Sequence, residues 1–410
     1  MQGDRRATRA RPLTGDGARH AAHLRGLNLE RVLLVAMERQ GPFTRAEIIR
    51  DTNLSAPTVG SLASDLIGRG LLRDLGTGPS RGGRRPSFME FNGRYGFDAG
   101  IHVASSNTLL AVADLRGEMI AQRTMPTPVD RGPTGLLAQV ASELRGLLRQ
   151  ARVPVSRLLA VGVGAPGAVD PGHGVVKALA PNLKGWTEVP VASLLRRAVG
   201  APVFVDNDVN LAILGERWRG VARGHDTCAF ITVGTGIGAG IIVKGELHHG
   251  HHFQAGEIAL MCMGPQFVDS DFGARGCLET LVGLKALEAR WSRHASSEGE
   301  PGARGLIEAA QAGDRRARGI LDETVTLIGI AAANLTLTLD PSLIVLGGAF
   351  IAQAPHTIDE IRRIVARVVL TPSGIMQSTL GESAPLWGAV LLAMSEARQR
   401  LRAQLKNGRS

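Results

Sequence analysis

The hydrophobic and polar positions near the start of the chain change their period several times. Residues 1–22 show no apolar period and are rich in Arg, Gly, Thr and Pro, which is typical of a disordered basic tail. From Asn28 the apolar residues recur every three or four positions, which predicts a helix that Gly41-Pro42 ends. The apolar positions of this helix are Leu29, Val32, Leu33, Ala36 and Met37.

Two shorter helices are predicted after the first. Thr44 is a typical helix N-cap, and Glu47 three positions later completes a capping box. After a turn at residues 52–54, Ser55 is a plausible cap for a third helix, with Pro57 in its first turn. The buried stripe of this third helix consists of Val59, Leu62, Leu66 and Ile67.

Two short strands, residues 71–75 and 88–91, follow and flank a loop of glycine and arginine. Three helices followed by such a hairpin form a winged helix-turn-helix, whose third helix enters the major groove of DNA while the wing follows the backbone or the minor groove. The alternative is a generic helical bundle. The candidate DNA contacts are Ser55, Thr58 and Ser61 in the third helix and Arg81, Arg84 and Arg85 in the wing.

Positive charge is concentrated in this segment. Residues 1–95 hold 16 Arg, no Lys and 9 acidic residues, so about +7 of the chain's formal net charge of +10 lies there. Arg binds phosphate and guanine through two parallel hydrogen bonds, which favours double-stranded DNA as a partner. A high Arg content can also reflect the base composition of a genome, so charge alone does not decide the matter.

The composition predicts a cytoplasmic protein that does not enter a membrane. Of the 410 residues 44% are hydrophobic, but no uncharged apolar run approaches the ~18 residues needed to cross a bilayer. The N-terminus has Arg from position 5 onward and no apolar signal core. The three cysteines have no paired spacing, which favours buried or incidental thiols over a disulfide framework.

From residue 97 onward, short apolar runs alternate with helical patterns, which predicts an α/β fold with layered sheets and helices. The expected strands are residues 97–103, 108–114, 158–163, 203–205, 229–233 and 239–243. The expected helices are residues 135–150, 209–218, 278–289, 323–339 and 387–404.

Seven short motifs occur along this α/β segment. They are Gly164-Ala165-Pro166-Gly167, Asn182-Leu183, Asp206-Asn207-Asp208, Gly234-Thr235-Gly236-Ile237-Gly238, Gly256-Glu257-Ile258, Gly276-Cys277-Leu278-Glu279 and Gly347-Gly348. Their order resembles the ROK family, named for repressors, open reading frames and kinases, over nearly the whole chain. The resemblance implies a winged helix-turn-helix at 23–91 and a two-lobed actin/hexokinase-like domain at 96–410. Its small lobe would span about 96–205 plus the C-terminal helix, and its large lobe about 206–385.

A polyol site is predicted where a strand ends and a helix begins. There the side chains of Asn207 and Asp208 can both hydrogen-bond hydroxyls. The resemblance gives Asp208 the catalytic-base position of ROK kinases and makes Asn182, Glu257 and Glu279 sugar ligands. The alternative for Asp208 is a helix cap without a ligand role.

A glycine-rich turn is a second candidate for ligand contacts. Its backbone N–H groups can bind a phosphate without lysine, although such a turn is commonly only a hairpin. Its residues Gly234, Thr235, Gly236 and Gly238 are predicted to be the remnant of a phosphate loop.

Two departures from the family pattern argue against catalysis and against metal. The family's Asp-x-Gly-Gly-Thr-Lys-like phosphate loop is replaced at Gly100–Val103, where Ile101 and Val103 are expected to hinder a nucleotide and no cation is supplied. Three of the four zinc-ligand positions are Leu260, Ser270 and Phe272, and only Cys277 remains. We therefore expect no cofactor and no zinc, with Leu260, Met261, Met263 and Phe272 packing in that loop.

A histidine cluster leaves metal binding open as an alternative. The side chains of His248, His249, His251 and His252 lie within five residues of one another and could bind a metal. The preferred interpretation is a loop that borders the sugar site, or solvated histidines.

The sequence as a whole predicts a transcription regulator, most simply a repressor, that binds a DNA operator. Its effector would be a carbohydrate or sugar phosphate, and it would act as a homodimer or homotetramer that reads paired half-sites. One alternative is a sugar kinase that retains ATP-dependent phosphorylation. Another is an architectural DNA binder that senses no ligand.

Overall fold

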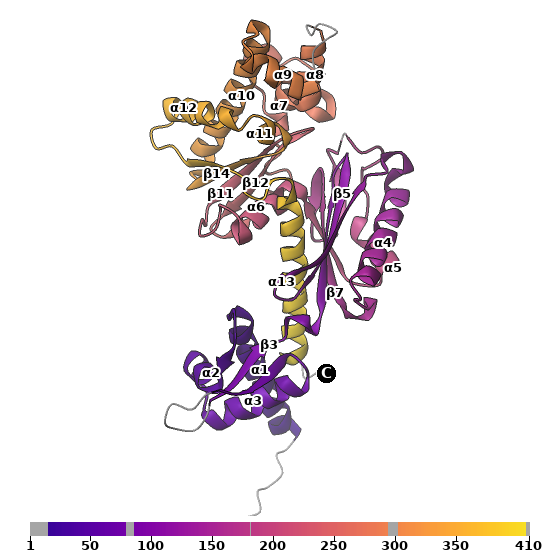
Figure 1. Ribbon diagram of the computed structural model, residues 1–410, viewed down its shortest axis with the longest axis vertical. Helices are drawn as coiled ribbons and strands as arrows, with labels where there is room; N and C mark the ends of the chain where they lie inside the picture. Colours follow the sequence, from indigo (N-terminus) through magenta and orange to yellow (C-terminus); the bar gives the residue numbers. More distant parts are fainter. Residues whose placement is uncertain (1–14, 79–85, 181, 294–301, 407–410) are drawn as a thin grey trace, which may run out of the picture. The chain divides into compact units, whose positions relative to one another are not determined.

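The computed structural model describes residues 15–78, 86–180, 182–293 and 302–406, which form two compact units (Figure 1). The first unit contains Met1–Gly96, Asp114–Arg116 and Ser395–Ser410, and the second contains Phe97–Ala113 and Gly117–Met394. The main boundary between the two units therefore lies between Gly96 and Phe97.

Besides the end of the last helix, the described residues of the first unit form three helices and a small sheet. Its elements are α1 (Gly15–Glu38), β1 (Phe43–Thr44), α2 (Arg45–Thr52), α3 (Ala56–Gly68), β2 (Leu72–Thr77) and β3 (Ser87–Phe91). The strands pair in the order β1-β3-β2. This is the arrangement of a winged helix-turn-helix, with β1 as a strand that the sequence did not predict.

Both predicted caps of these helices are present. Glu47 N donates to the side chain of Thr44 (3.3 Å), and Thr44 N donates to the carboxylate of Glu47 (2.7 Å), which together make the capping box of α2. The side chain of Ser55 accepts from Thr58 N (3.4 Å) at the start of α3. Asn53 allows the sharp turn between the two helices, because it adopts the left-handed conformation with φ 55°.

The first helix is longer than expected, and it packs against the end of the chain. It begins at Gly15, so residues 15–22 belong to a helix and not to the predicted tail. The last helix, α13 (Ala384–Lys406), starts in the second unit and ends in the first. A Cβ added at Gly26 of α1 would lie 2.7 Å from the carbonyl oxygen of Lys406, so the two backbones touch there. The predicted assignment of all of α13 to the sensor is therefore wrong for its last turns.

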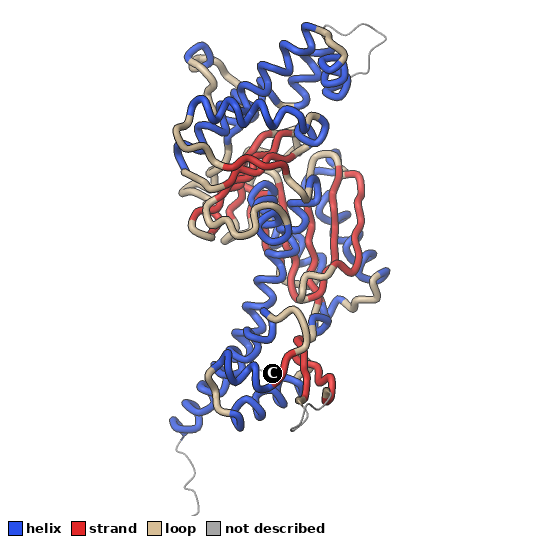
Figure 2. The backbone as a smooth tube through the Cα atoms, turned by 60° about the vertical axis from the view of Figure 1, so that its left-hand side comes forward, coloured by secondary structure: helices blue, strands red, loops and turns tan. Residues whose placement is uncertain are grey.

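The second unit has two lobes, each built on a five-stranded sheet. The small-lobe sheet has the order β10-β7-β4-β5-β6, and the large-lobe sheet has the order β13-β12-β11-β14-β15. Helices cover the outer faces of both sheets, as Figure 2 shows in blue around the red strands. This arrangement confirms the predicted two-lobed α/β fold.

The small lobe confirms four predicted strands and adds others. Its strands are β4 (Phe97–Val103), β5 (Asn107–Asp114), β6 (Met119–Pro126), β7 (Leu158–Ala165) and β10 (Val203–Asn207), with a ribbon of β8 (Ala168–Asp170) and β9 (Val175–Ala178). Its helices are α4 (Gly132–Gln150) and α5 (Val191–Val199). The first part of α13 also packs closely on this sheet, because a Cβ at Gly162 of β7 would lie 2.0 Å from the carbonyl oxygen of Ala389.

The large lobe contains most of the helices. Its strands are β11 (Cys228–Val233), β12 (Ile237–Val243), β13 (Glu246–Leu247), β14 (Leu343–Gly347) and β15 (Gly374–Gln377). Its helices are α6 (Asp208–Arg219), α7 (Cys277–Val282), α8 (Leu284–Ser292), α9 (Gly302–Gln311), α10 (Arg315–Leu339), α11 (Ala349–Gln353) and α12 (Ile358–Val368). The single helix predicted at 278–289 is two helices, which Gly283 separates.

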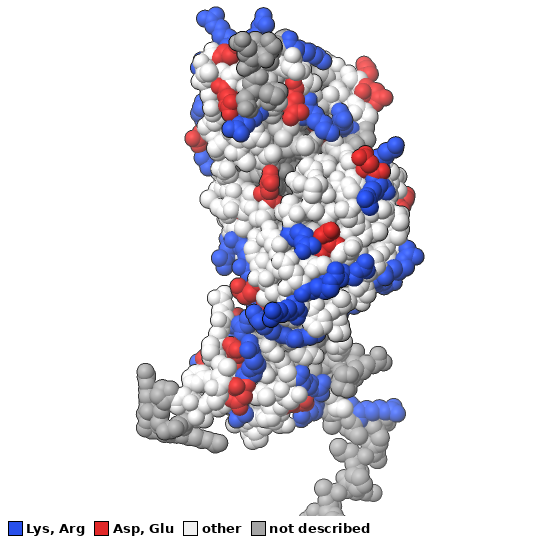
Figure 3. Space-filling model, turned by 45° about the vertical axis from the view of Figure 1, so that its right-hand side comes forward, with Lys and Arg blue, Asp and Glu red and all other residues white. Residues whose placement is uncertain are grey.

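Among the described helices, α10 alone has the length and composition that could cross a membrane, and 61% of its most apolar stretch is buried inside the second unit. Its buried apolar side chains belong to the core of the large lobe. Basic and acidic side chains lie interspersed over the face of the second unit drawn in Figure 3.

Candidate functional site

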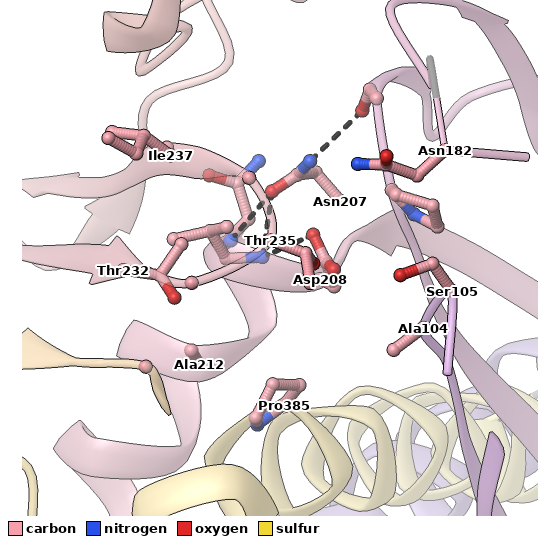
Figure 4. Close-up of a pocket in the computed structure, with 18 of the residues that line it drawn as sticks. Ala104, Ser105, Asn182, Asn207, Asp208, Ala212, Thr232, Thr235, Ile237 and Pro385 are labelled. Carbon is pink, nitrogen blue, oxygen red and sulfur yellow. Dashed lines mark hydrogen bonds between the residues drawn. The ribbon is translucent and has the colours of Figure 1, made fainter. Parts of the chain in front are cut away.

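A cavity of about 380 Å³ lies in the second unit, with walls from both lobes. This volume is within the range typical of small-molecule sites. All five predicted ligand residues line it, namely Asn182, Asn207, Asp208, Glu257 and Glu279. Figure 4 shows Asn207 and Asp208 opposite Asn182 and Ser105, with Pro385 at the start of α13 below them.

At the junction of β10 and α6, the helix cap and the candidate ligand contact are formed by different residues. Asn207 is the N-cap of α6, because its side-chain oxygen accepts from Val209 N (2.8 Å) and Asn210 N (3.1 Å). Its amide group donates to the carbonyl of Gly167 (3.0 Å). Asp208 accepts from Val209 N through Oδ1 only (3.0 Å), which leaves Oδ2 for other contacts. The capping function therefore does not require Asp208.

Two buried glutamates share the cavity with Asp208. Burial, strengthened by the charges of Asp208 and Glu279, raises the pKa of Glu257 to about 7. Burial also raises the pKa of Glu279, although its carboxylate accepts from Ile237 N (3.1 Å). Near neutral pH Glu257 therefore exists both as a carboxylate that accepts hydrogen bonds and as an acid that donates one.

The glycine-rich turn borders the same cavity. It joins β11 to β12, and Gly234 N donates to the carbonyl of Gly236 (3.0 Å). Gly234, Thr235, Gly236 and Gly238 all line the cavity. On the small-lobe side, Asn182 accepts from the ammonium group of Lys285 (2.9 Å). The placement is compatible with anion binding by this turn, which stays a prediction.

The structure changes the argument about the altered phosphate loop. Ile101 and Val103 are fully buried in the core of the small lobe, so the expectation that their side chains hinder a nucleotide is wrong. Gly100 faces α13, since a Cβ there would lie 2.7 Å from the side chain of Val390. His102 is the residue of this segment that lines the cavity. What remains of the argument is the absence of the family's threonine and lysine.

Sequence reasoning missed several cavity residues. His102 could have been found from strand alternation, because it faces the opposite side from the apolar positions 101 and 103. No comparable sequence pattern indicated that the turn after β4 and the residues before α13 would line the cavity. The missed polar lining residues include His102, Ser105, Ser106, Asn107, Thr124 and Glu382.

The histidine cluster forms contacts other than a metal site. His249 Nε2 lies 2.9 Å from Asp206 Oδ2, and this hydrogen bond raises the pKa of His249. The rings of His251 and His252 pack edge to face, with centroids 4.5 Å apart. Within the described parts of the chain, no three His, Cys, Asp or Glu side chains are grouped so as to hold a metal ion.

The loop that occupies the family's zinc position packs only in part as expected. Met261 and Met263 contact the core of the large lobe, and Phe272 packs on Phe267 with ring centroids 5.9 Å apart. Leu260 is 41% exposed, so its predicted packing role is wrong. That the protein binds no zinc stays a prediction.

The candidate DNA contacts in α3 lie at the surface of the first unit. The hydroxyl groups of Ser55 and Thr58 lie 2.8 Å apart, and the hydroxyl of Ser61 accepts from Arg25 (3.2 Å). Both serines are exposed and Thr58 is half-buried. The wing candidates Arg81, Arg84 and Arg85 lie outside the described residues.

Known proteins match both units. A model of the ROK family matches residues 98–396. A xylose repressor from Bacillus subtilis is 26% identical over 363 residues, which cover 88% of this chain and 93% of that protein. The crystal structure of a ROK hexokinase from Thermus thermophilus is 30% identical, with a TM-score of 0.63, and covers 74% of this chain and 99% of its own.

A third relative extends the likeness to the first unit. The crystal structure of a ROK family transcriptional regulator, a homologue of the Escherichia coli MLC protein, has a TM-score of 0.75. It covers 94% of this chain and 100% of its own at 22% identity, so it shows a shared fold that includes the N-terminal segment.

Proposed function

The chain belongs to the ROK family, and we propose that it is a DNA-binding transcription regulator, acting as a repressor, that responds to a carbohydrate. The observation that carries this proposal is that one chain contains a winged helix-turn-helix and a cavity lined by carboxylate and amide side chains, which can hydrogen-bond hydroxyl groups. The xylose repressor that resembles the chain over 88% of its length supports the same conclusion.

The first unit would bind double-stranded DNA. The exposed residues of α3, including Ser55 and Ser61, would contact base edges in the major groove, and Arg81, Arg84 and Arg85 would neutralise phosphates. One winged helix reads few bases, so we propose a homodimer or homotetramer that places two copies on paired half-sites. This activity would be exercised in the cytoplasm.

The cavity of the second unit would hold the effector. Carboxylates at Asp208, Glu257 and Glu279 would accept hydrogen bonds from ligand hydroxyls, and Asn182 would contribute from the small lobe. The bound species would be a carbohydrate or a sugar phosphate. Since the cavity walls come from both lobes, a bound ligand would favour one relative position of the lobes and thereby alter DNA binding.

We further propose that the second unit does not phosphorylate its ligand. The segment Gly100–Val103 is a regular part of β4, and it offers neither a lysine nor a threonine for the phosphates of a nucleotide. Without these groups, positioning and charge neutralisation of the transferred phosphoryl group would be lost.

Release of DNA by sugar tests the regulator proposal. Genomic fragments that bind the purified full chain would be selected, and their release by D-xylose, D-glucose and other simple sugars would be measured by fluorescence anisotropy. Asp208→Asn and Glu257→Gln should bind the same fragments but lose release by the active sugar. The matched control Glu188→Gln alters an exposed glutamate outside the cavity and should respond normally.

Catalysis by a sugar kinase is the second candidate function, and one observation favours it. Oδ2 of Asp208, the residue to which the resemblance gives the kinase-base position, is not used by the α6 cap, and a ROK hexokinase is 30% identical to the chain. ATP-dependent phosphorylation of a simple hexose at about one turnover per second or faster, abolished in Asp208→Asn, would establish this function instead.

A further inference from the structure

We propose that His102 contacts the effector directly and, together with Asp208, recognises one hydroxyl group of a neutral sugar. This inference rests on the proposed function, because it adds a residue to the same cavity. It also gives His102 a role different from that of the phosphate-loop residue whose position it occupies.

The two side chains face each other without forming a hydrogen bond. His102 Nε2 lies 3.6 Å from Asp208 Oδ2, which is too long for a hydrogen bond between them. The side chain of His102 is only 10% exposed, and neither ring nitrogen has a hydrogen-bond partner among the described residues. A buried polar group without a partner is costly unless a ligand satisfies it.

The strand register explains why these side chains meet. On the small-lobe sheet, His102 of β4 and Asp206 of β10 are both paired with Gly164 of β7, which lies between them. A Cβ at Gly164 would lie 3.5 Å from the Cα of Asp208. Because Gly164 has no side chain, Asp208 and Leu211 of α6 can lie close over β7, which brings Asp208 next to His102.

The gap between the two side chains suits the oxygen of a hydroxyl group. One oxygen can lie about 2.8 Å from both atoms, donating its proton to Asp208 and accepting from Nε2–H of His102. This arrangement uses both hydrogen-bonding capacities of the hydroxyl. An ether, or a deoxy position, could use only one or neither of them.

The charge of the cavity supports a neutral ligand. Four acidic residues line it, namely Asp208, Glu257, Glu279 and Glu382, and the described lining includes no Lys or Arg. Ionised carboxylates only accept hydrogen bonds, so His102 adds a donor beside Asp208. A phosphate beside Asp208 would meet a like charge, whereas a hydroxyl would not.

The test measures sugar binding to the full chain by titration calorimetry. The probes are D-xylose, D-glucose and the monodeoxy derivatives of each. The variants are His102→Leu, which removes both nitrogens at similar volume, and His102→Gln, whose amide nitrogen can replace Nε2. His173→Leu is the control, because this exposed histidine lies outside the cavity.

We expect His102→Leu to weaken the tightest-binding sugar by roughly tenfold or more, and His102→Gln to retain most of the affinity. One monodeoxy derivative should bind the wild type and His102→Leu equally, which identifies the contacted hydroxyl. A purely structural role would instead weaken every sugar by the same factor. That result, or unchanged affinities in both His102 variants, would overturn the proposal.

The design separates this inference from the regulator proposal. If the wild type binds none of the sugars, sugar sensing itself fails and His102 has no such role. If sugars bind and release DNA while the His102 variants behave like wild type, only the role of His102 is wrong. Thermal unfolding of each variant identifies any loss of folding, and the deoxy series on the wild type remains informative in that case.

Discussion

His249 Nε2 lies 2.9 Å from Asp206 Oδ2, so the loop after β13 is attached to the end of β10. The same loop carries Glu257, and Ala255 N donates to the carbonyl of His249 (3.2 Å). Asp206 therefore holds a segment of the large lobe next to the strand end from which Asp208 reaches the cavity. Because this contact involves the titratable imidazole of His249, the attachment of the loop to β10 is linked to the protonation of His249.

Replacement of His249 should destabilise the protein in a pH-dependent way. The hydrogen bond to Asp206 raises the pKa of His249 above 6.5, so folding favours the imidazolium form. Its contribution is full below pH 6.5 and is lost as the pH rises through the folded-state pKa. In urea denaturation, His249→Leu should therefore lose more stability at pH 6 than at pH 9. An equal loss at both values, or the same trend in the exposed control His356→Leu, would refute the assignment.

Glu257→Gln should stabilise the protein at alkaline pH. Burial raises the pKa of Glu257 from 4.5 to about 7, so the native state becomes less stable as the pH rises between these values. The glutamine variant avoids that cost and should gain up to about 3 kcal/mol over wild type above pH 7, with little gain near pH 4.5. Chemical denaturation at pH 5 and pH 8 measures the difference, and Glu188→Gln is the exposed control. A gain that does not grow with pH would show that burial of the charge is not the cause.

Alanine at Gly26 should destabilise the first unit. The new methyl group would lie 2.7 Å from the carbonyl oxygen of Lys406 and 2.8 Å from that of Leu405, and backbone atoms cannot move aside easily. Overpacking of this kind costs about 1–3 kcal/mol. Gly60→Ala in α3 is the matched control, because nothing lies within 4 Å of its added Cβ and alanine favours a helix by roughly 0.5–1 kcal/mol. Thermal unfolding of the full chain should move in opposite directions for the two variants.

The wing arginines should contribute to the salt dependence of DNA binding. Each phosphate contact adds about 0.9 to the slope of log K against log salt concentration, so Arg84→Ala with Arg85→Ala should lower the slope by up to about 2. Arg304→Ala with Arg363→Ala removes the same charge from α9 and α12 and should leave the slope unchanged. If the slope of the wing variant equals that of wild type, these arginines do not contact phosphate.

Local signals predicted much of the fold from the sequence. The Thr44–Glu47 box and the Ser55 cap depend on neighbouring residues, and both occur as expected. The run 97–103 is a strand with the predicted bounds, because its apolar residues alternate at positions 97, 99, 101 and 103, which is the period of a strand. The strand β6 was missed because it has mainly half-exposed or exposed residues and weak apolar alternation.

The sequence predicted the site residues that belong to a motif. It did not predict the contacts that arise when strands distant in sequence pair with one another. Asn207, Asp208 and Glu257 belong to motifs whose order suggested a family. The approach of His102 to Asp208 depends on the register of three strands around Gly164, which no local pattern encodes. The error over Ile101 and Val103 has a different origin, because the alternation of apolar residues along β4 already placed both side chains on the side of the core.

The first unit, which we propose to bind DNA, is not a continuous stretch of chain, since the last turns of α13 pack on α1. During synthesis, residues 1–96 leave the ribosome about 300 residues before Ser395–Lys406. Until then the surface of α1 around Gly26 lacks its partner. A chain truncated anywhere within the second unit would therefore lack part of the first unit. Such a chain has no complete sugar cavity to release it from DNA, and its incomplete first unit makes it poorly suited to bind an operator.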